Sequence, residues 1–149
     1  MKIIKCKCSK DILLDDDCVA WFVTQSYSCN GKALQIAGVN VASLILGHAE
    51  VTLVDHVDRN SHNNQRSNLR IATRQQNNAN KGPYKNGSGY KGVSFYSGKW
   101  QARIYKNKKL YRLGCFINIH DAARAYNEKA RLLYGEFAYI NPISENAIQ

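Results

Sequence analysis

Apolar and polar positions alternate most regularly in the C-terminal third of this 149-residue chain. Three segments show the two-residue period of a strand with one buried face: residues 90–96, 99–105 and 110–116. Ser97-Gly98 predicts a tight turn between the first two segments. Apolar residues at helical spacing follow Asn118, an expected N-cap with Asp121 in a capping box, and end near Tyr134 before Gly135. We therefore predict a three-stranded antiparallel sheet packed on one helix.

The two faces of this sheet are expected to differ. The apolar face would carry Val93, Phe95, Trp100, Ala102, Ile104, Tyr111 and Leu113. The helix would cover that face with Ala122, Tyr126, Ala130 and Leu133. The opposite face would carry Ser94, Tyr96, Gln101, Arg103, Tyr105 and Arg112. The pattern thus predicts a core on one side and a polar surface on the other.

The N-terminal half has a less regular pattern. Short apolar runs predict short strands and one short helix over residues 1–53, and residues 39–47 are expected to form a buried strand or a short helix. Val51-Thr52-Leu53-Val54 then predicts a strand, followed by an asparagine-rich loop and a helix that begins near Thr73. Fold class is therefore α+β in both halves.

A segment rich in glycine, residues 82–89, predicts a linker. We expect one domain at residues 1–81, with its core at residues 51–81, and a second domain at residues 90–142.

Charge is uneven along the chain, whose formal net charge is +10. Residues 1–50 carry five Lys and five acidic residues, whereas residues 81–149 carry twelve Lys or Arg and four acidic residues. This asymmetry indicates a polyanionic partner, most commonly nucleic acid, although a well-solvated surface would have the same composition. The apolar runs are too short for a membrane span, so no membrane partner is expected.

The five cysteines form an odd set without a Cys-x-x-Cys pair: Cys6, Cys8, Cys18, Cys29 and Cys115. Reduced thiols in a cytoplasmic protein are expected. The Cys-x-Cys spacing at Cys6 and Cys8 argues against a structural zinc ion, because zinc knuckles usually have a two-residue gap. His48, His62 and His120 are predicted to be surface residues.

Candidate chemistry is concentrated between Val54 and Asn78. Asp55 and Asn77 offer oxygen ligands that suit one hard divalent cation, Mg²⁺ or Mn²⁺. His56 can accept a proton from water near neutral pH, and Asn68 can brace the loop through hydrogen bonds to backbone groups. Because adjacent residues of a regular strand point to opposite faces, Asp55 and His56 would need a bend to share a site.

The run from Asp55 to Asn60, Asn63-Asn64, Ser67-Asn68-Leu69-Arg70 and Asn77-Asn78 resembles the phage-type branch of the HNH endonucleases. The resemblance implies a ββα-metal (His-Me finger) nuclease module. It also implies that Asp55 and Asn77 hold the metal, that His56 is the general base, and that Asn68 is the central asparagine of the motif.

Two positions depart from that family. Ala42-Ser43 stands where members often carry a His-Arg pair, and Arg59 stands at a turn position that is usually glycine. A side chain at Arg59 would cost free energy if the turn needs positive φ.

The C-terminal segments Tyr90-Lys91-Gly92-Val93, Trp100 to Ile104 and Tyr111 to Phe116 resemble the DNA-binding domain of the Apetala/ethylene-response-factor type. The resemblance implies that the sheet enters the major groove of double-stranded DNA. The polar face of the sheet and one nearby lysine are expected to supply the contacts: Lys91, Ser94, Tyr96, Gln101, Arg103, Tyr105 and Arg112.

These features together predict a metal-dependent HNH DNA endonuclease of the homing type, encoded by a phage or mobile element and located in the host cytoplasm. It would hydrolyse a phosphodiester bond near a site held by the C-terminal sheet, nicking one strand or cutting both, as a monomer or a homodimer. The alternatives are a catalytically inactive DNA-binding regulator and a protein that binds or cleaves RNA.

Overall fold

The computed structural model describes residues 2–31, 33–47, 53–84 and 87–143. The chain divides into two compact units, Met1–Asn77 and Asn78–Gln149. The division falls inside helix α3 (Arg74–Asn80), so the limits at residues 81 and 90 stay predictions. None of the described helices is long and apolar enough to cross a membrane.

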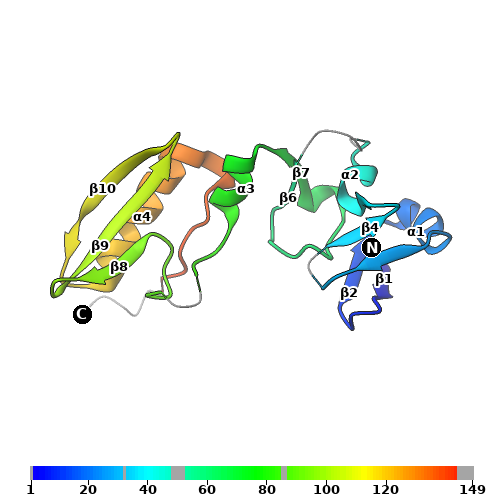
Figure 1. Ribbon diagram of the computed structural model, residues 1–149, viewed down its shortest axis with the longest axis horizontal. Coiled ribbons are helices and arrows are strands. Elements are labelled where there is room, and N and C mark those ends of the chain that lie inside the picture. Colours follow the sequence, from blue (N-terminus) through cyan, green and yellow to red (C-terminus); the bar gives the residue numbers. More distant parts are fainter. Residues whose placement is uncertain (1, 32, 48–52, 85–86, 144–149) are drawn as a thin grey trace. The chain divides into compact units, whose positions relative to one another are not determined.

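The first unit begins with small antiparallel sheets (Figure 1). A hairpin is formed by β1 (Lys2–Lys5) and β2 (Asp11–Leu14). A three-stranded meander follows: β3 (Tyr27–Cys29), β4 (Leu34–Ile36) and β5 (Val39–Asn40). The helices of this part are α1 (Asp16–Val23) and α2 (Val41–Ile45). Their common core contains Ile12, Leu14, Phe22, Leu34 and Val41.

The described residues of this region form two helices where the sequence predicted one. Asp16 and Asp17 in the first turn of α1 favour its positive N-terminal end. Cys18 and Phe22, four residues apart, are both buried, which is the spacing of one helix face. The apolar run 19–23 therefore forms a helix, because its neighbours supply helical signals that the run alone does not show.

The second half of this unit is an antiparallel hairpin of β6 (Leu53–His56) and β7 (Leu69–Ala72). Val51 and Thr52 of the predicted strand lie outside the described residues. The loop between the strands ends in a 3-10 helix, η1 (Arg66–Asn68). Helix α3 has a capping box at Thr73, whose hydroxyl accepts from Gln76 N at 3.2 Å while Gln76 Oε1 accepts from Thr73 N at 2.8 Å. The predicted start of this helix is confirmed.

The loop is also joined to the N-terminal hairpin. Leu13 N donates to His62 O, and Asn64 N donates to Leu13 O, both at 2.9 Å. These bonds form a short parallel bridge between β2 and the loop. Residues fifty positions apart in the sequence are thereby held together by the backbone.

The second unit has the predicted sheet and helix. Its strands lie in the order β10 (Lys109–Phe116), β9 (Lys99–Lys106) and β8 (Val93–Tyr96). Helix α4 (Ile119–Tyr134) lies along one face (Figure 1). Ser97 and Gly98 both have positive φ, as a type I′ turn requires. The Asn118 side chain accepts from His120 N, but Asp121 pairs with Arg124 at 2.6 Å, so the capping box is not formed.

Small side chains make the contact between α4 and the sheet. Val93 and Ala102 of the strands pack on Ala122 and Ala123 of the helix, and Ile104 packs on Tyr126 and Ala130. The prediction that Phe95 is part of this core is wrong: its side chain is 60% exposed near the hairpin tip, where it meets the Trp100 ring with centroids 4.9 Å apart.

Gly92 lies where this unit is packed most closely. Its φ is +73°, and a Cβ atom there would lie 2.2 Å from the Tyr126 ring. Glycine alone combines that backbone conformation with that approach.

Candidate active site

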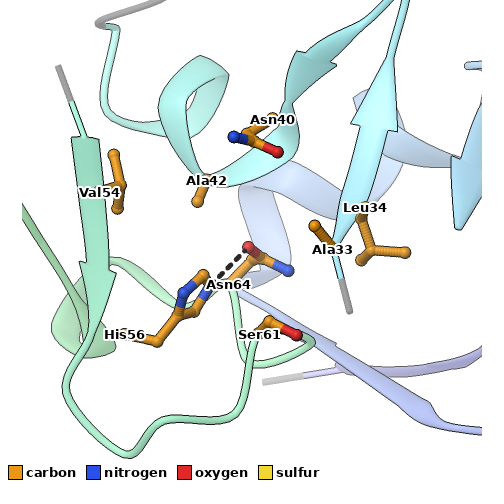
Figure 2. A pocket seen from close by; sticks show the side chains of 8 residues that line it. All are labelled: Ala33, Leu34, Asn40, Ala42, Val54, His56, Ser61 and Asn64. Atoms are coloured by element: carbon orange, nitrogen blue, oxygen red, sulfur yellow. Dashed lines mark hydrogen bonds between the residues drawn. The ribbon is translucent and has the colours of Figure 1, made fainter. Parts of the chain in front are cut away.

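His56 ends strand β6 beside a small pocket. The pocket has a volume of about 170 Å³ and is lined by Ala33, Leu34, Asn40, Ala42, Val54, His56, Ser61 and Asn64. Figure 2 shows the His56 ring directed at the Asn64 side chain, and the Nε2–Oδ1 distance is 3.2 Å. Because an amide oxygen only accepts, Nε2 is the donor in this contact and the ring lone pair lies on Nδ1. Asn64 therefore sets the tautomer of His56, a role that the sequence did not indicate.

Asn64 itself is almost completely buried, at 1% exposure. Among the described residues, its Nδ2 is the one buried side-chain nitrogen or oxygen atom without a hydrogen-bond partner. The amide nitrogen lies on the side of Asn64 away from His56 (Figure 2). A buried donor without a partner is costly, so this amide is suited to a water molecule or an anionic oxygen that enters the pocket.

Asn68 holds the loop that follows His56. Its Oδ1 accepts from Asp58 N at 3.0 Å, and its Nδ2 donates to Asp58 Oδ1 at 2.9 Å and to Asn63 O at 2.8 Å. Val57 N also donates to Asn68 O. The side chain thus forms the bonds of the loop brace expected from the sequence, and its part in catalysis stays a prediction.

Asp58 is the acceptor at the centre of this loop. Its carboxylate accepts from Asn60 N and from Asn63 Nδ2, both at 2.8 Å, besides Asn68. Burial alone would raise the pKa of Asp58, but these hydrogen bonds outweigh it, and the pKa lies below its ordinary value. The loop is therefore organised around a charged carboxylate.

Asp55, the expected metal ligand, is buried and paired. Arg70 lies opposite it on β7, and Arg70 Nε and Nη2 donate to Asp55 Oδ2 at 2.9 and 2.7 Å. Both side chains are little exposed, at 5% for Asp55 and 14% for Arg70. Local sequence patterns do not indicate this pair, because β-pairing register decides which residues face each other.

Asp55 and Asn77 have the ligand types of the expected metal site, but Asp55 already has a charged partner. A carboxylate and an amide oxygen suit Mg²⁺ or Mn²⁺, but one Asp55 oxygen already accepts two bonds from Arg70. Asn77 is half-buried on α3. A cation at Asp55 would have to displace the Arg70 guanidinium or share the carboxylate with it.

Strand β6 keeps a regular register through His56. Asp55 pairs with Arg70, and His56 pairs with Leu69. Their side chains therefore leave opposite faces of the strand, and β6 does not contain the bend that a shared site was expected to need. The described turn begins only after His56, where Arg59 N donates to His56 O at 2.9 Å.

The two family departures have structural counterparts. Arg59 has φ of +66°, so the turn does need the conformation that glycine adopts without strain. Ala42 is buried and forms part of the wall of the His56 pocket. Its short side chain leaves open the space that a longer residue on α2 would fill.

His62 is not a surface residue, contrary to the sequence prediction. It is 1% exposed, and its Nε2 lies 3.4 Å from both Cys8 Sγ and Cys29 Sγ. With Cys6 these residues form a group whose ligand atoms all lie within 4.8 Å of one another. The sequence argued against a structural zinc ion, but the structure brings Cys6, Cys8, Cys29 and His62 into an arrangement that could hold a metal ion. Cys18 does not belong to this group.

The predicted DNA-contacting residues divide into two sets. On the sheet, Tyr96 and Tyr105 are 67% and 58% exposed, and Arg103 and Arg112 are also exposed. Ser94 and Gln101 are half-buried. Lys91 is differently placed: its ammonium donates to the carbonyls of Asn78, Ala79 and Lys81 at 2.9, 2.5 and 2.6 Å. These bonds use all three donors at the C-terminal end of α3.

Comparisons with known proteins give partial similarities. No protein-family model and no solved structure matches the chain. It is 40% identical over 90 residues to an uncharacterized HNH endonuclease of Acanthamoeba polyphaga mimivirus, which covers 60% of this chain and 47% of the relative. It is 41% identical over 63 residues to APETALA2-like protein 2 of Oryza sativa and to an AP2-like ethylene-responsive transcription factor of Arabidopsis thaliana.

The plant alignments cover 41% of this chain but only 13–14% of the plant proteins. The chain spans about half the length of the viral relative that it matches. These similarities support the combination of an HNH-type part and an AP2-type part in one chain.

Proposed function

We propose that the chain is a metal-dependent HNH-type DNA endonuclease, in which the first unit hydrolyses a phosphodiester bond and the second binds double-stranded DNA. The observation that carries this proposal is the His56 imidazole, oriented by Asn64 at the edge of a pocket. Its loop is held by a hydrogen-bond network around the buried Asn68. The viral HNH endonuclease similarity supports the same reaction class.

His56 is the proposed general base. With Nε2 donating to Asn64, the proton from the attacking water would pass to Nδ1. A neutral imidazole accepts a proton near neutral pH. The unpartnered Asn64 Nδ2 lines the same pocket, where it can hold a phosphate oxygen or the water. Asn68 acts as a positioning residue, because it contacts the loop and not the pocket.

Asp55 and Asn77 are the proposed ligands of Mg²⁺ or Mn²⁺, which when bound would supply Lewis-acid stabilisation of the phosphate. Asp55 would then change partners, since Arg70 occupies one of its oxygens. A guanidinium so displaced is well suited to a phosphate oxygen, which it can bind in the same planar geometry. We therefore expect Arg70 to influence the metal concentration at which cleavage occurs. The end of β6 would also have to bend for Asp55 and His56 to act on one phosphate.

The second unit is the proposed DNA-binding part. The exposed sheet residues Arg103, Arg112, Tyr96 and Tyr105 offer cationic and aromatic groups on the face opposite α4. The similarity to AP2-type transcription factors supports duplex DNA as the partner. Joining this unit to the first raises the effective concentration of the hydrolytic site at DNA.

Nicking of supercoiled plasmid with added Mg²⁺ or Mn²⁺ tests the proposal. We expect His56→Ala to lower the nicking rate at least about 100-fold, because it removes the general base, while duplex affinity in a gel-shift assay stays near that of the wild type. Thr24→Ala, an exposed substitution in the same unit, should change neither. Full metal-dependent nicking by His56→Ala would refute the assignment of the base.

A second candidate function is a DNA-binding regulator without hydrolytic activity. The pairing of Asp55 with Arg70 favours it, because the arginine already neutralises the expected metal ligand. A wild-type protein that shifts duplex DNA but does not nick plasmid at any Mg²⁺ or Mn²⁺ concentration would support this second function over the first.

A further inference from the structure

Three sulfur atoms and one imidazole nitrogen converge in the first unit. Cys8 Sγ lies 3.2 Å from Cys6 Sγ and 3.2 Å from Cys29 Sγ. The Nε2 atom of His62 lies 3.4 Å from the sulfur atoms of both Cys8 and Cys29. Within the part of the chain that the structure describes, this is the one group of three or more His, Cys, Asp or Glu residues arranged to hold a metal ion.

These atoms come from three separate segments. Cys6 and Cys8 lie in the turn between β1 and β2, where Ser9 N donates to Cys6 O and Ser9 has φ of +67°. Cys29 is the last residue of β3. His62 lies in the loop between β6 and β7, 54 positions from Cys8. Hydrophobic packing alone does not explain why the His62 imidazole nitrogen faces two sulfur atoms.

The spacing fits a tetrahedral metal ion. Zinc–sulfur bonds of about 2.3 Å place tetrahedral ligand sulfurs about 3.8 Å apart. Four of the six ligand-atom pairs are slightly closer than this, at 3.2–3.4 Å, and all six pairs lie within 4.8 Å. A central ion therefore requires small shifts of the ligand side chains. Three thiolates and an imidazole are typical of a structural zinc site, and soft thiolates select against Mg²⁺ and Mn²⁺.

The groups around the cluster also suit a thiolate site. Gly31 N donates to Cys29 Sγ at 3.4 Å. Ser61 Oγ lies 3.4 Å from His62 Nδ1, the ring nitrogen that points away from the sulfurs, as outer partners of metal-bound histidines commonly do. The Lys10 ammonium donates to Gly31 O at 2.6 Å, which brings a positive charge close to a site whose net charge with zinc would be −1.

We propose that Cys6, Cys8, Cys29 and His62 bind one Zn²⁺ ion in a structural site. Four protein ligands leave no open position for water or substrate, so this ion takes no part in hydrolysis. Its effect is to fasten three segments to one point. Metal binding would add to the stability of this unit, whose apolar core is small, because metal-binding free energy becomes folding free energy in small domains.

The position of His62 connects this site to the candidate active site. Only Asn63 separates His62 from Asn64, whose side chain orients His56. The His62 carbonyl and the Asn64 amide both bond to Leu13. Zinc at His62 would therefore hold the loop in the conformation that presents Asn64 to His56, and its loss should loosen the loop before the β6–β7 hairpin itself.

Metal analysis of the purified full-length chain, kept reduced, tests this proposal. We expect one zinc per chain, and after exchange with Co²⁺ we expect the thiolate charge-transfer and intense visible bands of tetrahedral cobalt. Cys29→Ser should lose the metal. Cys115→Ser, at an exposed cysteine outside the group, should keep full zinc content and the same spectrum.

A second variant covers the case in which Cys29→Ser fails to fold. His62→Cys keeps four soft ligands, so it should bind one metal ion with a stronger thiolate charge-transfer band. Asp55→Asn should leave the zinc content unchanged, which separates this site from the proposed catalytic metal. Reduced, folded wild-type protein that takes up no zinc, or zinc lost in Asp55→Asn but kept in Cys29→Ser, would overturn the proposal. A disulfide between these cysteines in protein purified under reducing conditions would do the same.

Discussion

The two units of this protein hold their functional groups in different ways. In the second unit, alternating side chains of β8, β9 and β10 pack on small residues of α4, and the polar residues are displayed on the opposite face. In the first unit, the groups around His56 lie on an irregular loop that is fixed by side-chain hydrogen bonds and by its connection to β2. One is an apolar layer, and the other is a polar network.

The two units should therefore be destabilised by different kinds of substitution. An apolar layer tolerates changes on its outer face but not at its closest contacts, because interiors are densely packed. A polar network depends on each buried donor and acceptor, since an atom left without a partner costs free energy. Substitutions should therefore affect one unit at a time, which amide hydrogen exchange resolved by mass spectrometry can follow in the full chain.

The largest effect is expected for Gly92→Ala. Its Cβ would lie 2.2 Å from the Tyr126 ring at a positive φ, so the helix and sheet must separate, at a cost of about 3 kcal/mol or more. Exchange protection should fall in the second unit and stay unchanged in the first. Gly98→Ala is the matched control, because its positive φ opens onto empty space; it should cost about 1 kcal/mol. Equal costs for the two variants would contradict close packing at Gly92.

An intermediate effect, in the first unit, is expected for Asn68→Ala. Removal of three side-chain hydrogen bonds at a buried position should cost about 2–3 kcal/mol. The loss of exchange protection should begin in the loop between β6 and β7 and leave β8–β10 protected. Asn78→Ala, which removes one exposed contact with Lys81, should cost less than about 0.5 kcal/mol. Similar losses for both asparagines would mean that the network does not hold the loop.

The smallest effect is a gain, expected for Arg59→Gly. The residue has φ of +66°, and relief of the left-handed strain should stabilise the first unit by about 1 kcal/mol in urea unfolding. Arg59→Ala keeps the Cβ atom and removes the charge, so it should bring no such gain. A gain shared by both variants would assign the effect to the charge of Arg59 instead of its backbone.

Much of the second unit could be predicted from the sequence. The three strands, the Ser97-Gly98 turn, the Asn118 cap and the end of α4 at Gly135 all follow from local patterns. The prediction that Phe95 is buried is wrong, because periodicity assigns a residue to a face of the sheet but does not show how much of that face the helix covers. Lys91 is a predicted DNA contact because its charge is visible in the sequence, whereas its three carbonyl partners are visible only in the structure. Its part in DNA binding stays a prediction.

In the first unit the sequence indicated the candidate catalytic residues but not their surroundings. The contact of His56 with Asn64 and the pairing of Asp55 with Arg70 both depend on how the loop and β7 return to β6. The acidic start of α1 outweighed the strand-like apolar run that follows it. These outcomes depend on neighbours that periodicity does not include.

By itself, the sequence determined the local elements, the uneven charge and the residues suited to phosphodiester chemistry, because backbone periodicity and side-chain chemistry act over a few neighbouring positions. The tertiary structure alone decided that Arg70 shares the Asp55 carboxylate and that His62 joins Cys6, Cys8 and Cys29. Such groups come from segments tens of residues apart. They meet only where strand register and loop closure bring the chain back on itself.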